Sequence, residues 1–205
     1  MNQVSVKFNC QINNDNDISE GFQVIPVALF GIDVKQCEEF YRQLPALLIE
    51  GGVFDEKYEA MLYRVEGSLC LDHLHKIDEW AGFPISAWPE EIVWEILIAL
   101  ATISYPDVSL IESLLTLDGL DASRLSHWLH ILTNVYPIYD KDACAGLRKL
   151  GLVCPYEVTD MASYGLYVSL IEGIKEYAPA TALPEYSLPR QRLIQLGLAA
   201  WAKKN

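Results

Sequence analysis

The sequence predicts a mainly α protein in which residues 33–205 form a helical body and residues 1–32 form a small amino-terminal β-hairpin packed on it. Two observations carry this prediction. From Asp33 onward, apolar residues recur at spacings of three and four, which is the period of an amphipathic helix. Before that point, apolar residues alternate with polar ones over residues 3–12, which is the period of a half-buried strand.

Composition and length limit the class of protein. The 205 residues are enough for one well-filled domain, and 51% hydrophobic with 21% charged residues is typical of a folded chain. No apolar run reaches the roughly 18 residues that a membrane-spanning helix needs. The amino terminus lacks a basic region followed by an apolar core. Five cysteines without a framework spacing favour reduced thiols. Together these features predict a cytoplasmic protein with no membrane partner.

The amino-terminal hairpin is predicted from two apolar segments. The first is residues 3–12, and the second is the run 22–30 between Gly21 and Gly31. Pro26 cannot donate to a strand ladder, so it is expected at an edge or a bulge.

Capping residues and stop signals divide the helical body. Asp33 is a suitable N-cap and Gly51 a suitable stop, while Pro89 followed by two glutamates is typical of a helix start. The helix 90–104 is apolar on almost every side, which predicts a central, buried element. The predicted helices are 33–50, 55–74, 90–104, about 107–115, 122–132, 140–150, 160–177 and 189–202.

The segment 117–140, LDGLDASRLSHWLHILTNVYPIYD, carries most of the functional information. A turn containing Gly119 leads into a helix with apolar residues at helical spacing, and Asp140 then stands at the start of the next helix. With the short helix before the turn, residues 107–132 form a unit of helix, hairpin and helix.

This order resembles the core of the helix-hairpin-helix DNA glycosylases, in which a Leu-x-Gly-hydrophobic-Gly hairpin precedes a helix and a catalytic aspartate follows one helix later. The resemblance covers residues 105–155, about a quarter of the chain, and is one of spacing more than identity. Asp121 stands where the second hairpin glycine is expected. Ser123 stands where bifunctional members have a nucleophilic lysine.

The resemblance implies a set of site residues. Asp140 would be the catalytic carboxylate of a monofunctional glycosylase that acts on a damaged or modified base in DNA, since Ser123 cannot form a Schiff base. Five residues would contact nucleic acid, and two aromatic residues would stack on the extruded base. The first set is Gly119, Ser123, Arg124, Lys141 and Arg148, and the second is Trp128 and Tyr139. No cofactor or metal is expected, because the cysteine cluster of the iron–sulfur members is absent.

The charge distribution leaves an alternative open. Residues 1–115 hold 6 basic and 19 acidic residues, whereas residues 116–205 hold 9 of each. DNA, which requires lysine and arginine to neutralise its phosphates, would therefore bind the carboxyl-terminal half. The acidic half would suit a basic protein partner. One alternative is a catalytically inactive protein that keeps the helix-hairpin-helix fold and binds such a partner. Another is an unrelated helical domain with a protein partner, in which the resemblance is accidental. For Asp140, the simpler interpretation is an N-cap without a catalytic role.

Overall fold

The computed structural model describes residues 6–8, 23–25, 27–62, 69–85, 87–102, 112–179, 183 and 186–204. Within these ranges the chain is mainly helical, which confirms the predicted fold class. The longer helices are α1 (Val34–Glu50), α2 (Glu56–Leu62), α3 (Leu71–Ala81), α4 (Glu90–Thr102), α6 (Ala122–Thr133), α7 (Lys141–Lys149), α8 (Met161–Tyr177) and α9 (Arg190–Lys203).

The amino-terminal hairpin is present in a shorter form than the sequence predicts. Strand β1 (Val6–Phe8) pairs antiparallel with β2 (Gln23–Ile25), with Lys7 opposite Val24. The second predicted strand does not extend to residue 30, because Val27–Leu29 forms a 3₁₀ helix. The remainder of the first predicted strand, residues 3–5 and 9–12, lies outside the described residues.

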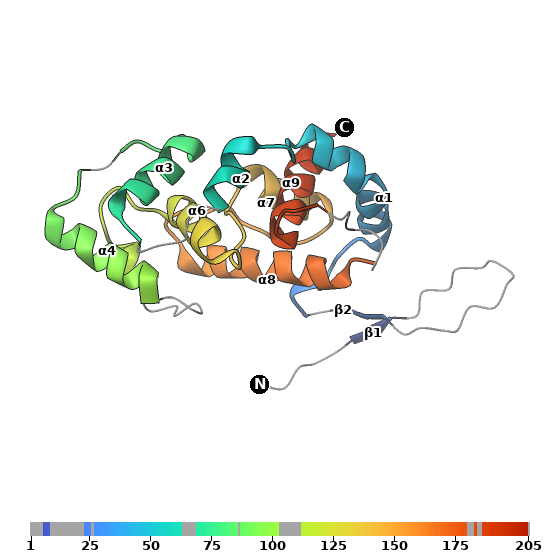
Figure 1. The fold of residues 1–205 in the computed structure, drawn as a ribbon. Coiled ribbons are helices and arrows are strands. Elements are labelled where there is room, and N and C mark those ends of the chain that lie inside the picture. Colours follow the sequence, from blue (N-terminus) through green and yellow to red (C-terminus); the bar gives the residue numbers. More distant parts are fainter. Residues whose placement is uncertain are drawn as a thin grey trace, which may run out of the picture.

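Helix α9 is the shared packing partner of α1, α7 and α8 in the helical body. Helix α7 packs most extensively on α9, which also contacts α1 and α8. Figure 1 shows α4 at one end of the body and α1 at the other, with α6, α7 and α9 between them. The backbone N–H of Asp33, which caps α1, donates to the carbonyl of Leu150 at 2.7 Å and so ties α1 to the end of α7.

Aspartates start several helices as the sequence predicts. Asp33 accepts hydrogen bonds from Lys35 N and Gln36 N at the start of α1, and Asp160 caps α8 in the same way. Such caps satisfy backbone N–H groups that have no partner inside the helix. The predicted end of the helix at residue 150 is also confirmed: Gly151 follows α7 with a φ of +87°, a conformation that glycine adopts most easily.

Two helix predictions are wrong. The single helix predicted over residues 55–74 is broken, because α2 ends at Leu62 and α3 begins after Cys70, whose backbone is extended. Helix α4 is not a central, buried element: Trp94 is 59% and Ile98 60% exposed. Only one side of α4 carries buried side chains, among them Ile96 and Leu100. Apolar composition on every side of a helix therefore did not decide which side packs.

The short helix predicted at about 107–115 falls largely on residues 103–111, outside the described residues. Of the rest, Glu112, Ser113 and Leu114 are helical, and a turn follows.

Candidate functional site

The turn before α6 forms as expected, but two backbone N–H groups at the start of α6 already have hydrogen-bond acceptors. Gly119 has a φ of +77°. The Asp121 carboxylate caps α6 and accepts from Arg124 N at 2.8 Å, and Ala122 N donates to the carbonyl of Val158 at 2.8 Å. A phosphate at a helix start needs free N–H groups. Here Asp121 and Val158 already occupy two of them.

Arg124 lies inside the protein, where it cannot contact a phosphate. Its side chain is 2% exposed, and the Asp78 carboxylate accepts from its Nε at 3.1 Å and from its Nη2 at 2.5 Å. Asp78 is itself fully buried on α3. The guanidinium also lies over the rings of Trp88 and Trp128, 4.7 and 5.3 Å from their centroids. The structure gives Arg124 the role of a core ion pair, in place of the predicted DNA contact.

The two predicted stacking residues are also core residues. Trp128 is fully buried and donates from Nε1 to Asp78 at 2.8 Å. Tyr139 is fully buried among the rings of Tyr156, Tyr164 and Tyr167. A ring enclosed in this way has no free face for an extruded base. Both assignments are therefore corrected.

Ser123 is buried as well. It is 9% exposed, and its hydroxyl donates to the carbonyl of Tyr139 at 3.2 Å, so it holds the segment before α7 against α6. Of the two predicted cations on α7, Lys141 is exposed. Arg148 is also exposed, and its Nη1 donates to the carbonyl of Cys154 at 2.5 Å. Gly119 is exposed too, so Gly119, Lys141 and Arg148 are the predicted DNA contacts that remain at the surface.

Asp140 is half-buried at the start of α7, and two donors orient its carboxylate. Its Oδ1 accepts from Ala143 N at 2.8 Å, which is the cap of α7. Its Oδ2 accepts from the side-chain amide of Gln195 on α9 at 3.0 Å. A residue that served only as an N-cap would need the first of these contacts alone.

Asp140 faces a hollow of about 290 Å³ between the end of α1, the start of α7 and one face of α9. Its lining contains three carboxylates and two cationic side chains. The lining residues are Glu50, Gly51, Asp140, Asp142, Arg192, Gln195, Leu196, Ala199, Ala200 and Lys203. At the rim, Lys203 pairs with Asp142 at 2.9 Å and Lys204 lies 3.8 Å from Glu50.

Arg192 extends inward from the hollow. Its Nη1 donates to the side-chain oxygen of Gln195, so the Gln195 amide bridges the guanidinium and Asp140. The guanidinium lies 5.0 Å from the ring centroid of Tyr58 and 5.5 Å from that of Trp80. Burial lowers the pKa of Arg192, although the nearby charges of Asp140 and Asp55 oppose the shift. A guanidinium still stays charged at every pH at which the fold exists.

Tyr58 connects this site to a buried histidine. His130 Nδ1 lies 2.5 Å from the carbonyl of Tyr136, which can only accept, so this nitrogen carries the proton. The Tyr58 hydroxyl then donates to Nε2 of His130 at 2.6 Å. Burial lowers the pKa of His130 to about 3, and burial also lowers the pKa of His127.

Because burial lowers the pKa of both histidines, we expect the protein to be less stable in acid. The unfolded chain binds protons at both imidazoles below pH 6.5, whereas the folded protein keeps them neutral. The free energy of unfolding therefore falls as the pH drops from about 6.5 toward 3. Between pH 7 and pH 5 the loss is about 2 kcal/mol for His130 alone. Urea denaturation at the two pH values measures it. A His130→Gln variant should show a shallower dependence, and equal wild-type stabilities at pH 7 and pH 5 would contradict the assignment.

A second hollow, of about 390 Å³, lies between α2, α3 and α6. Its lining is mostly apolar, with Met61, Ile77 and Ile131 among its members and Lys57 and Lys76 among its cations. It is larger than the hollow at Asp140 but does not contain that residue. Asp140, the carboxylate singled out from the sequence, therefore lines the smaller hollow.

Part of the smaller site could be anticipated. The sequence singles out Asp140 as a carboxylate and counts Arg192 among the cations of the carboxyl-terminal half. The spacing of three between Arg192 and Gln195 places both on one face of a helix, which is a usable signal. Glu50 gives no signal, because it resembles any solvated glutamate at the end of a helix.

The described residues contain no group of three or more histidine, cysteine or carboxylate side chains that could hold a metal ion. Over the same part of the chain, no helix is both long and apolar enough to cross a bilayer. Comparisons with protein-family models, curated proteins and solved structures find no match.

Proposed function

We propose that this chain hydrolyses the N-glycosidic bond of a damaged or modified base in DNA, with water as nucleophile and Asp140 as the catalytic carboxylate. One observation carries the proposal. The Asp140 carboxylate is held by Ala143 N and by the Gln195 amide, and it lines a hollow of about 290 Å³. A hollow of that size is at the lower end of the range for small-ligand sites, which suits a single extruded base.

The chemistry requires a fixed negative charge beside the sugar. Positive charge develops on the sugar ring as the base leaves, and a preoriented carboxylate stabilises it without reorganising. The same carboxylate can take a proton from the attacking water. Gln195 and Ala143 each donate to one oxygen of Asp140, so the carboxylate is already oriented before the reaction begins.

The exposed cations Lys141 and Arg148 on α7 would contact the DNA backbone in this proposal. They are seven residues apart on one helix, so they lie on the same side of it. Neither cation requires free N–H groups at the start of α6. The contact with the DNA backbone would thus be made by α7 and not by the hairpin.

The test is an Asp140→Asn variant assayed on duplexes that each carry one modified base. Asparagine keeps the N-cap of α7 but removes the charge, so the fold should be retained. We expect the rate of base release to fall by about 100-fold or more. Abasic sites, revealed by alkaline cleavage of the DNA, provide the measurement.

An Asp160→Asn variant is the matched control. Asp160 caps α8 through Ala162 N and Ser163 N, as Asp140 caps α7, but it does not line the hollow. Its base release should equal that of the wild type. An Asp140→Asn protein that releases bases at the wild-type rate would refute the catalytic assignment.

A second candidate function is a non-catalytic interaction protein with this fold. Two observations favour it: Asp121 and Val158 close the helix end that the hairpin would present to a phosphate, and Asp78 holds Arg124 in the core. The segment 1–115, which has an excess of acidic residues, would then bind a basic protein. Absence of both base release and duplex binding at low salt would favour this candidate, since phosphate contacts are strongest there.

A further inference from the structure

The larger hollow, of about 390 Å³, is separate from the site proposed for glycosylase chemistry. Its walls come from α2, α3 and α6, which contact one another in pairs (Figure 1). Among the described residues, none lines both this hollow and the hollow at Asp140. A volume of this size is within the range of small-ligand sites, whereas a stable protein partner would cover roughly 800 Å² of surface.

The most buried residues of the larger hollow are apolar. Ile77 of α3 and Ile131 of α6 are each 2% exposed, and Met61 of α2 is half-buried. Water in contact with such side chains is released when the apolar part of a ligand takes its place, which favours binding. The hollow therefore suits a ligand with an apolar body.

The same hollow carries positive charge on a strongly acidic protein. The chain has a net charge of -13, and residues 1–115 hold 6 basic residues. Two of these six, Lys57 and Lys76, line the hollow together with Glu79. Within the described part of the chain, neither lysine forms an ion pair. A ligand with one negative charge would balance two lysines and one glutamate.

The spacing along α3 places one of these lysines next to a second donor and next to the apolar surface. His73 and Lys76 are three residues apart, and Ile77 follows His73 by four, so the three lie on one face of the helix. Cys70 N donates to His73 Nδ1 at 3.3 Å, so the neutral imidazole carries its proton on Nε2. His73 is half-buried in the lining, and its Nε2 has no acceptor among the described residues.

We propose that the larger hollow binds a small amphipathic carboxylate, such as a medium-chain alkyl carboxylate. The carboxylate accepts from Lys76 Nζ and from His73 Nε2, and the alkyl chain lies against Ile77 and Ile131. A carboxylate has the single negative charge that the lining balances, whereas a phosphate monoester carries about 1.5 to 2 at neutral pH. This site is independent of the proposed glycosylase function and adds a second ligand to the protein.

Titration of the full chain with octanoate tests the inference. Octan-1-ol, octylamine and octyl phosphate have the same alkyl chain with a neutral, a positive and a more negative head. Two-dimensional ¹H–¹⁵N spectra give the dissociation constants and the residues whose signals shift. We expect octanoate to shift the amide signals of His73, Lys76, Ile77 and their neighbours. Octan-1-ol and octylamine should bind at least about tenfold more weakly, because they cannot form the charge-assisted hydrogen bonds of a carboxylate.

Three variants refine the test. Lys76→Gln should weaken octanoate binding by about tenfold and leave octan-1-ol binding unchanged. Lys35→Gln, at an exposed position of α1 outside the hollow, is the matched control and should leave both unchanged. Ala60→Phe, at an exposed position of α2 that lines the hollow, should weaken both compounds, because the ring fills space that the alkyl chain needs. All three positions are exposed, so the variants should fold.

The outcomes are distinct. Equal affinities for octanoate and octan-1-ol, or no shift around the hollow with either, would overturn the inference. Octanoate binding that is unchanged in Lys76→Gln would also overturn it, as would tighter binding of octyl phosphate than of octanoate. Selective octanoate binding that is weakened by Lys76→Gln and by Ala60→Phe would support it. None of these results depends on base release from DNA, which the Asp140→Asn variant tests separately.

Discussion

Replacing Asp78 by alanine is expected to destabilise the protein by about 3–5 kcal/mol. Asp78 is fully buried and accepts from Nε and Nη2 of Arg124 and from Nε1 of Trp128. Its removal leaves a guanidinium and an indole N–H in the core without this acceptor. Breaking one side of a buried ion pair costs much more than the pair itself contributes, because the remaining charge stays desolvated. Urea denaturation followed by circular dichroism measures the loss.

Two further variants separate the unpaired charge from other effects. Glu79→Ala changes the next residue of α3, which is exposed, so its stability should stay within about 0.5 kcal/mol of the wild type. A double variant, Asp78→Leu with Arg124→Met, removes both charges and keeps apolar volume, so it should recover most of the lost stability. If the double variant is as unstable as Asp78→Ala, packing rather than charge explains the cost.

Local signals in the sequence predicted the helices well. Asp33, Asp121, Asp140 and Asp160 each precede a run with helical periodicity, and each is an N-cap in the structure. Caps are readable because the accepting side chain and the donating backbone are two or three residues apart. The break between α2 and α3 had no such signal, since the apolar spacing continues across it.

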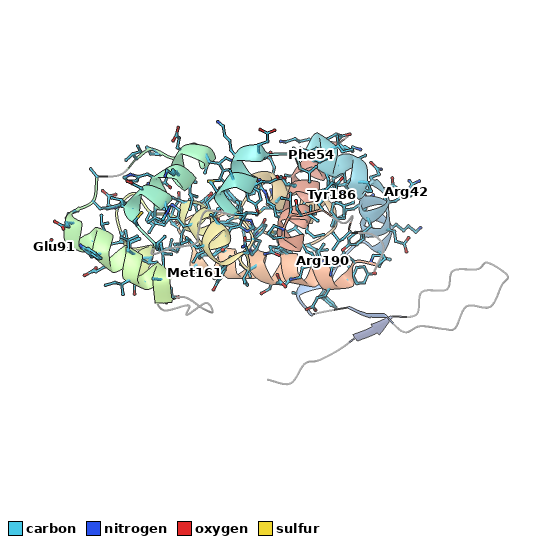
Figure 2. All side chains as sticks on the ribbon, in the orientation of Figure 1. Arg42, Phe54, Glu91, Met161, Tyr186 and Arg190 are labelled. Carbon is cyan, nitrogen blue, oxygen red and sulfur yellow. The ribbon has the colours of Figure 1, made fainter. Side chains whose placement is uncertain are left out.

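Contacts between residues far apart in the chain could not be predicted from the sequence. From the sequence alone, Arg124 is expected to be a surface cation. In the structure it pairs with Asp78, which lies 46 residues earlier in the chain. The contact between Asp140 and Gln195 spans 55 residues. Aromatic residues have the same ambiguity. Figure 2 shows Phe54 and Tyr186 side by side, and their rings, 6.0 Å apart, come from opposite parts of the chain. Pairs of this kind depend on how helices dock, which periodicity does not encode.

Helix docking in turn predicts a large effect at Gly146. A Cβ atom at Gly146 of α7 would stand 2.3 Å from the carbonyl oxygen of Leu198 on α9. Backbone on both sides prevents a local adjustment, so the two helices must separate. Gly146→Ala should therefore cost about 3 kcal/mol, the upper end for overpacking a core. Denaturation midpoints provide the measurement.

Two other helical glycines give the matched series. At Gly197 a Cβ would meet the Cδ1 atom of Leu44 at 2.4 Å, and a side-chain end can rotate away, so Gly197→Ala should cost less. At Gly165 nothing lies within 4 Å, and alanine should stabilise α8 by about 0.5–1 kcal/mol. A Gly146→Ala protein at least as stable as Gly197→Ala or Gly165→Ala would contradict the packing of α7 on α9.

The Gly146 contact also reaches the candidate site. It sets the distance between α7 and α9, and the hydrogen bond from Gln195 to Asp140 crosses the same interface at the start of α7. If Gly146→Ala moves α7 away from α9, this bond should lengthen, and the Asp140 carboxylate should lose one of its two donors. If the chain has the proposed glycosylase function, a folded Gly146→Ala protein should then lose base release in parallel with Asp140→Asn, whereas Gly165→Ala should retain it. Full activity in Gly146→Ala would mean that Asp140 works without the contact from α9.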